Sequence, residues 1–208
     1  MEPAIGLLEF DSIAVGIRAG DAMVKRGPVE VIYAGTVHPG KYLVLVGGEV
    51  APVEEALAAG REAGVGYLID EIFLPDAHPH VAEALGGPRS GSGEESLGVV
   101  ETRTAAAILG AADRGVKGAA VALRRIRVAD DLGGKAYCLF DGELPEVEAA
   151  VELAVAGLKT PDLLVSQVVI PRLHAEMQEN LEAAPEFLPR VRSRGNPPSV
   201  PPFSKGGG

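Results

Sequence analysis

Apolar and polar positions follow one another in the same order twice along this chain. A short apolar run opens each half, at residues 4–9 and again at residues 97–101, and its length suits a buried strand. Later in each half, two apolar runs flank a polar turn, which predicts a hairpin. The strands of the two hairpins are expected at residues 29–33 and 42–46, and at residues 120–128 and 136–140.

A helix is predicted after the first strand. Ser12 is a suitable N-cap, because its hydroxyl can accept a hydrogen bond from an N–H group of the first helical turn. The helix is expected to end near residues 27–28, a Gly-Pro pair. Five residues at helical spacing are expected to form one face of this helix: Ile13, Gly16, Ile17, Gly20 and Val24.

The remaining elements complete each half. A second helix is expected to open at Pro52 in the first half and at Pro145 in the second, because proline suits the first helical turn. A fourth strand at residues 67–74 or 163–170 then ends at a proline, and a short helix follows. The order βαββαβα predicts an α+β fold, with two helices on one face of a four-stranded, mostly antiparallel sheet.

The recurrence is an internal duplication. Gly6 corresponds to Gly98, 92 residues later, and His78 corresponds to His174, 96 residues later, so the second copy has gained a few residues. The period is far longer than that of solenoid repeats, and each copy is therefore expected to be a small domain. The predicted parts are a first domain at 1–88, a Gly/Ser-rich linker at 89–94, a second domain at 95–184 and a disordered Pro/Gly-rich tail at 185–208.

Composition narrows the function classes. The formal net charge of −10 argues against a nucleic-acid scaffold, which needs a concentrated basic surface. No apolar run has the length of a membrane span, so a cytoplasmic protein is expected. Cys138 is the only cysteine, so it supplies neither an intrachain disulfide nor a cluster site within one chain. No catalytic motif emerges, and we expect no enzyme.

Short segments in both halves resemble the bacterial microcompartment shell proteins, whose domain is called BMC. AIGLLE and LGVVET are similar to the first strand of that domain, GDAMVK and ADRGVK to the end of its first helix, and IPRLH to the segment after its fourth strand. Tandem copies resemble the trimeric branch, BMC-T. The resemblance implies a homotrimer that forms a pseudohexameric tile, packs beside shell hexamers and pentamers in a microcompartment shell, and passes small metabolites through a central pore.

The resemblance also implies roles for individual residues. The pore would be lined by two turns, one made of Thr36, Val37, His38, Pro39 and Gly40, the other of Asp130, Asp131, Leu132, Gly133 and Gly134. The tile edges would be formed by Lys25, Lys117 and Arg172. Ordinary local chemistry explains part of this set equally well, because lysine suits a helix C-terminus and aspartate suits a solvated turn.

His38 leaves several functions open. The loop TVHPGK is most similar to that of the propanediol-utilisation trimeric shell proteins, in which a pore cysteine helps bind an iron-sulfur cluster. The present chain has histidine there, and imidazole is an uncommon cluster ligand. The alternatives are an open solute pore, a metal site of three His38 imidazoles, and an iron-sulfur cluster. A small-molecule-sensing regulatory trimer, permitted by the α+β pattern alone, is a further alternative.

Overall fold

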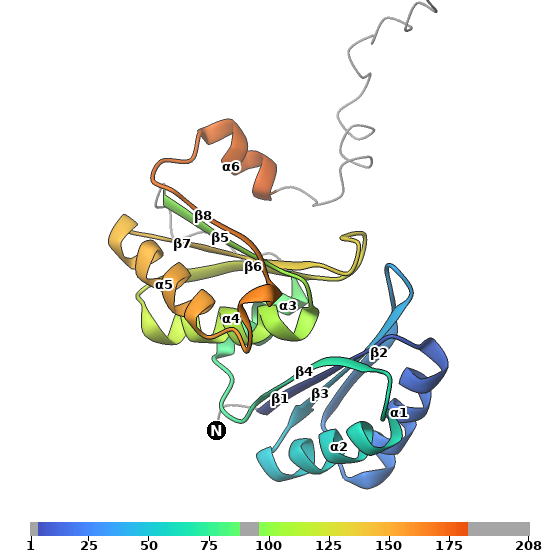
Figure 1. Ribbon diagram of the computed structural model, residues 1–208. Coiled ribbons are helices and arrows are strands. Elements are labelled where there is room, and N and C mark those ends of the chain that lie inside the picture. Colours follow the sequence, from blue (N-terminus) through green and yellow to red (C-terminus); the bar gives the residue numbers. More distant parts are fainter. Residues whose placement is uncertain (1–3, 88–95, 183–208) are drawn as a thin grey trace, which may run out of the picture. The chain divides into compact units, whose positions relative to one another are not determined.

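The computed structural model describes residues 4–87 and 96–182, and it contains the predicted order of elements twice (Figure 1). The first repeat consists of β1 (Ala4–Phe10), α1 (Ile13–Arg26), β2 (Val31–Val37), β3 (Lys41–Gly48), α2 (Val50–Ala63), β4 (Leu68–Leu74) and α3 (Pro79–Gly86). The second consists of β5 (Ser96–Thr102), α4 (Ala105–Gly118), β6 (Ala122–Val128), β7 (Ala136–Gly142), α5 (Leu144–Ala156), a 3₁₀ turn η1 (Pro161–Leu163), β8 (Leu164–Ile170) and α6 (Ala175–Glu182). The α+β class is confirmed.

Each repeat contains one four-stranded sheet, in which every strand pairing is antiparallel. The strand orders are β2-β3-β1-β4 and β6-β7-β5-β8, so corresponding strands occupy corresponding places. Even an irregularity recurs, because the register shifts between Glu9 and Phe10 and again between Glu101 and Thr102. The two repeats are therefore equivalent residue by residue along the central strands.

The core of the first repeat lies between its sheet and the helices α1 and α2 (Figure 1). Side chains alternate between the two faces of a strand, so Leu8 and Phe10 of β1 point to these helices. Gly60 of α2 permits a close approach, because a Cβ there would lie 2.5 Å from Leu8 Cδ1. The second repeat buries the equivalent layer with α4 and α5.

The opposite face of the first sheet is also covered. Every residue of β1 is buried, including Ile5 and Leu7 on the face turned away from α1 and α2. Helix α4 of the second repeat packs on β1 and β4 there. Gly110 of α4 leaves space for the side chain of Ile72, since a Cβ at that glycine would lie 3.2 Å from Ile72 Cδ1. The two repeats thus share a buried interface.

One compact unit extends to Arg172 and contains both sheets, and a second unit begins at Leu173 and contains α6. The domain boundaries predicted from the sequence remain predictions, and the linker 89–94 and the tail 185–208 lie outside the described residues. Within the described ranges, none of the helices is long and apolar enough to cross a membrane.

The prediction of a single apolar face on α1 was wrong. Gly16 and Gly20 do face the protein's own sheet, against Tyr42 and Val44. The three large residues lie on another side and are exposed, by 40% for Ile13, 54% for Ile17 and 43% for Val24. The two glycines allow one side of the helix to approach the sheet closely. The helix therefore has two apolar sides, one of small and one of large residues, and only the side with the glycines is buried within the chain.

Two boundaries also differ from the sequence-based expectation. Helix α2 begins at Val50, two residues before Pro52, and it tolerates the proline because N–H groups of the first turn have no intrahelical acceptor in any case. Strand β2 continues to Val37, so Thr36 and Val37 pair with β3 instead of belonging to the turn.

Candidate functional site

The first predicted pore turn is reduced to three residues, His38, Pro39 and Gly40, at the tip of the β2-β3 hairpin. The Gly40 N–H donates to the carbonyl of Val37 at 2.9 Å and closes the turn. Gly40 has a φ of 101°, which glycine adopts without strain. The His38 side chain is 70% exposed, so the hairpin presents an imidazole to solvent.

The second turn is wider, and it joins β6 to β7 through all five predicted residues. Two non-glycine residues take positive φ values, 55° at Ala129 and 58° at Asp131. The Ala129 N–H donates to the Lys135 carbonyl at 3.0 Å, and the Leu132 N–H donates to the Ala129 carbonyl at 3.2 Å. Left-handed residues and backbone hydrogen bonds therefore give this loop a defined shape.

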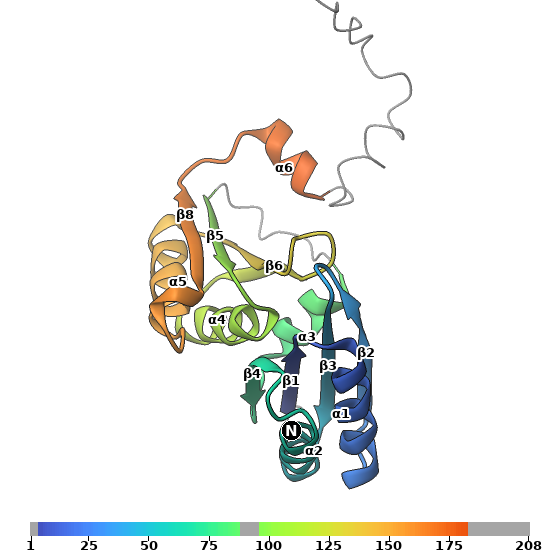
Figure 2. The ribbon, with the colours of Figure 1, turned by 45° about the vertical axis from the view of Figure 1, so that its right-hand side comes forward.

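The two turns lie side by side, although Asp130 follows Gly40 by 90 residues in the sequence (Figure 2). His38 Nδ1 is 3.7 Å from Asp131 Oδ1. Gly134 packs against the other turn, where an added Cβ would lie 3.0 Å from Pro39 Cδ. Both partners of the His38–Asp131 pair are about 70% exposed, so the pair contributes little to stability. It does bring the two predicted pore segments together within one chain.

Residues 4–87 and 96–182 of one chain do not by themselves assemble a metal site. Among the described residues, no group of three or more histidine, cysteine, aspartate and glutamate side chains is placed to hold a metal ion. Cys138 lies in β7 and is fully buried, and burial raises the pKa of its thiol far above the ordinary value. Any metal at His38 would need further copies of the chain.

The three predicted edge residues differ in their surroundings. Lys25 is 73% exposed and pairs with Asp21, 2.6 Å away on the same helix. Lys117 is 37% exposed, pairs with Asp113 at 2.9 Å, and also donates to the Asp76 carbonyl of the first repeat. Arg172 follows β8 and is exposed. All three residues are exposed, and the role of each at a tile edge stays a prediction.

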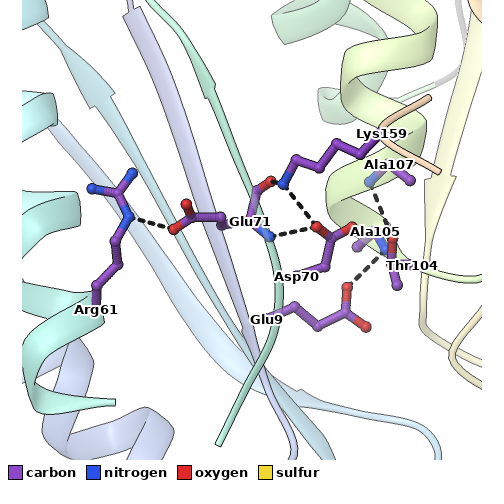
Figure 3. Close-up of polar contacts among 8 residues, drawn as sticks. All are labelled: Glu9, Arg61, Asp70, Glu71, Thr104, Ala105, Ala107 and Lys159. Carbon is purple, nitrogen blue, oxygen red and sulfur yellow. Dashed lines mark hydrogen bonds and ion pairs between the residues drawn. The ribbon is translucent and has the colours of Figure 1, made fainter. Parts of the chain in front are cut away.

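A buried polar network joins the two repeats (Figure 3). Glu9 is completely buried in β1; its Oε1 accepts from Lys41 at 2.6 Å and its Oε2 accepts from the backbone N–H of Ala105 at 2.9 Å. Ala105 is the first residue of α4, so the carboxylate also faces the positive end of the helix dipole.

Asp70 of β4 extends this network. Its Oδ2 accepts from the hydroxyl of Thr104 at 2.6 Å, and its Oδ1 accepts from Lys159 Nζ at 2.9 Å. Lys159 also donates to the carbonyl of Glu71. Thr104 is at the same time the N-cap of α4, since its hydroxyl accepts from Ala107 N–H at 3.2 Å. The start of α4 is thereby fixed to the first sheet through two carboxylates.

The environment of Glu9 affects its proton affinity. Burial is the largest influence and raises the pKa of the Glu9 carboxyl above its ordinary value, while the Lys41 ammonium and the Ala105 N–H partly offset it. The only clue in the sequence was an acidic residue inside an apolar run, repeated as Glu101. That clue cannot show what covers either residue, because the cover comes from another repeat.

The interface between the repeats is formed by α4 and by the face of the first sheet at β1 and β4. The surfaces that correspond to these two by the internal repeat are on α1 and on β5 and β8, and both are exposed. Where Leu109 and Val116 of α4 are buried, their counterparts Ile17 and Val24 of α1 are exposed. Where Asp70 of β4 is buried, its counterpart Ser166 of β8 is exposed. The chain thus leaves uncovered one helix face in the first repeat and one sheet face in the second.

Comparisons with known proteins agree with this architecture. The family model for the BMC domain matches twice, at residues 4–77 and 96–173. The chain is 41% identical over 177 residues to the bacterial microcompartment shell protein PduT of Citrobacter freundii, which covers 85% of this chain and 96% of that protein.

Two solved structures extend the comparison. The crystal structure of a microcompartment protein from Desulfitobacterium hafniense DCB is similar with a TM-score of 0.77 and 36% identity, over 86% of this chain and 99% of that one. The fused permuted hexameric shell protein MSM0275 from the RMM microcompartment has a TM-score of 0.55 at 19% identity, over 77% and 83% of the two chains, and supports the fold alone.

Proposed function

We infer the function from one premise: this chain belongs to the BMC domain family, with two tandem copies, and it is a shell protein of a bacterial microcompartment. From that premise we propose that three copies close into a pseudohexameric tile. The number three follows from the resemblance of tandem copies to the trimeric branch. The role is structural, and no catalytic chemistry is required of the chain.

The observation that carries this proposal is the pair of open faces. Within the chain, one helix face and one sheet face meet in a buried interface. The equivalent helix face and the equivalent sheet face are both exposed, so each can make the same contact with a neighbouring chain. Such a head-to-tail contact is heterologous, and it generates a ring when the rotation closes. The α1 face of one chain would cover the β5-β8 face of the next, as α4 covers β1 and β4 within the chain.

Equivalent residues support the same contact in detail. Glu101 is hydrogen-bonded to Lys135, as Glu9 is to Lys41. In the tile, the other oxygen of Glu101 would accept from the backbone N–H of Ile13 in the neighbouring copy, as Glu9 accepts from Ala105 N–H. The N-cap geometry is repeated, since Ser12 accepts from Val15 N–H at 3.4 Å.

The apolar side chains change size in compensating directions. Within the chain, the small Ala105 of α4 accompanies the large Leu7 and Ile72 of the first sheet. Between chains, the large Ile13 of α1 would accompany the smaller Val99 and Val168, the latter 47% exposed. Volume-conserving exchanges of this kind preserve packing. The exposed face of α1 and the open sheet face are thus suited to each other.

The pore of the tile would be formed by the two turns of each chain. Three copies of His38-Pro39-Gly40 and three of the Asp130–Gly134 loop would surround one axis, next to Thr36 and Val37 at the end of β2. The observed proximity of His38 to Asp131 supports this, because both loops of a chain already lie together. A ring of polar, exposed side chains suits the passage of small polar metabolites.

Tile edges would carry Lys25 and Arg172, which are both exposed. Lys117 contributes less in this proposal, because its ammonium already binds Asp113 and the Asp76 carbonyl. The partners at these edges would be neighbouring shell hexamers and pentamers. The relatives named above are shell proteins, which favours this tile over a sensing trimer.

The proposal is tested by imaging the purified full-length chain by negative-stain electron microscopy. We expect discs of uniform size that pack into sheets, and Lys25→Asp is expected to prevent the sheets while preserving the discs. Lys117→Asp serves as the matched comparison and should affect folding more than sheet formation. Particles of single-chain size without discs would contradict the tile.

A metal at His38 stays a prediction with its own experiment. Three imidazoles at the axis could bind zinc or copper. Metal analysis of protein purified without oxygen, together with its absorption spectrum, would detect either ion or a cluster, and His38→Ala should remove it. Metal-free native protein with normal discs would leave the open solute pore as the function of this loop.

A further inference from the structure

Helix α6 is the structural repeat of α3, down to its first turn. In α3, His78 is the N-cap, and its Nδ1 accepts from the backbone N–H of His80 at 3.2 Å. In α6, His174 Nδ1 accepts from the N–H of Glu176 at 3.3 Å. The carbonyls of the two histidines accept from Val81 N–H and Met177 N–H, both at 2.9 Å. Two helices built alike would be expected to dock alike.

Their surroundings are nevertheless opposite. Helix α3 packs on β6 and α4 of the second repeat, where Ala77, Val81 and Ala84 are buried to within 1% exposure. None of the eight residues of α6 is buried, and Met177 is 51% exposed. The equivalent of the surface that receives α3 lies on β2 and α1 of the first repeat. It is exposed too, with Ile32 of β2 at 40%.

We propose that α6 docks on β2 and α1 of a second copy of this chain, as α3 docks on β6 and α4 within the chain. The inference rests on the head-to-tail tile proposed above and adds a separate contact to it. In the template, the His78 backbone N–H donates to Asp113 Oδ1 at 2.8 Å. The equivalent contact would join the His174 N–H to the carboxylate of Asp21 of the partner subunit.

Side-chain size favours this occupant. Where α3 and its flanking residue have Ala77 and Val81, α6 and its flanking residue have the larger Leu173 and Met177. On the receiving strand the change is reversed, since Ile126 of β6 corresponds to Ala34 of β2 by its place in the hairpin pairing. A larger helix against a smaller strand keeps the interface filled.

Charge favours the same occupant. Helix α6 carries three acidic residues and no basic one: Glu176, Glu179 and Glu182. The last turn of α1, which would lie near it, carries Lys25 and Arg26. Opposite charges on the two surfaces favour their association and its register. A second copy of this chain therefore fits α6 in shape, in hydrogen bonding and in charge.

The test is a disulfide between Asp21→Cys and His174→Cys in the full-length chain. Cys138 is buried, so the engineered pair reacts alone. The matched control is His78→Cys with Asp113→Cys, which should link within one chain and leave its size on a non-reducing gel unchanged. For the Asp21→Cys/His174→Cys variant we expect covalent dimers and trimers that a reductant returns to single chains.

The outcomes separate this inference from the tile itself. A disc-forming trimer whose 21–174 pair links only within a chain, or not at all, overturns the inference and leaves the tile standing. A monomeric wild-type chain overturns both. If the double-cysteine variant fails to fold, Met177→Glu in the native chain decides: we expect about tenfold weaker trimer association, and unchanged association would reject the docking of α6.

Discussion

The helices α1 and α4 hold the same place in the two repeats, yet they differ in what covers them. Both have 14 residues, and both begin after a hydroxyl N-cap, Ser12 or Thr104. Ten residues of α4 are buried but only four of α1. Since fold and length are the same, the difference in burial comes from the neighbouring sheet. Helix α4 packs on the sheet of the first repeat, whereas α1 would find an equivalent sheet only in another copy of the chain.

The two sheets show the complementary difference. Asp70 of the first sheet is buried and holds Thr104 and Lys159, whereas the equivalent Ser166 of the second sheet is exposed and has no carboxylate. The internal junction is therefore fixed by charge, and the proposed junction between chains relies more on apolar fit. Unlike junctions favour one order of domains around the ring, because the wrong pairing would leave buried charges without partners.

The strongest expected effect comes from breaking the internal junction. Glu9→Ala leaves the ammonium of Lys41, whose side chain is 16% exposed, without its carboxylate, and we expect a loss of about 3 kcal/mol in the free energy of unfolding. Urea denaturation followed by circular dichroism measures it. Glu101→Ala is the matched control and should spare the folding of the chain while weakening the trimer; equal losses would contradict the comparison.

The apolar counterpart is the pair Leu109 and Ile17. Leu109→Ala empties a fully buried position between α4 and the first sheet, and we expect a loss of about 2–4 kcal/mol in the free energy of unfolding. Ile17→Ala removes a side chain that is 54% exposed, so it should lower the association of chains and leave the single chain folded. Thermal melts and sedimentation over a concentration series separate the two effects.

The N-caps sharpen the comparison with a smaller effect. Thr104→Ala removes both the cap of α4 and the hydrogen bond to Asp70, and it should cost about 2 kcal/mol. Ser12→Ala removes a cap alone, for about 1 kcal/mol. The difference between the two losses, measured by urea denaturation, reports the Thr104–Asp70 contact. A double variant with Asp70→Ala that shows simple additivity would argue against their coupling.

The smallest effect concerns pH. The pKa of Glu9 is raised in the folded chain above its ordinary value of 4.5, so the folded state binds more protons than the unfolded state in that range. The contribution of Glu9 to stability therefore falls as pH rises from 4.5 through its folded-state pKa.

Glu9→Gln isolates this contribution, because glutamine does not titrate. The difference in unfolding free energy between wild type and variant should decline across that pH window and be flat below it. A difference that increases with pH would mean that Lys41 and the helix dipole outweigh burial at Glu9.

The repeat and the order of elements were predictable, because apolar periodicity and glycine and proline positions are local signals. The turn at His38 was also found, although strand pairing through Thr36 and Val37 shortened it. The sequence could not show that α1 has two apolar sides with different surroundings. Gly16 and Ile17 both fit the apolar pattern of a helix, and only the structure shows that Gly16 is buried against the protein's own sheet while Ile17 is exposed.

The junction between the repeats lay beyond sequence reasoning. Glu9, Asp70 and Lys159 come from distant segments, and their meeting depends on how two complete domains dock. For the same reason the contacts of Lys117 with Asp113 and the Asp76 carbonyl were not foreseen, and its place at a tile edge stays a prediction. Local sequence patterns predict helices and strands, whereas contacts between domains are found only in the three-dimensional structure.

The central claim is that the exposed face of α1 meets the open sheet of another copy. The most direct measurement is the mass in solution of the full-length chain and of Ile17→Glu, by light scattering after size exclusion. We expect three times the 21.5 kDa of one chain for wild type, and 21.5 kDa with unchanged circular dichroism for Ile17→Glu. A wild-type mass of one chain, or a trimer that Ile17→Glu leaves intact, would contradict the account.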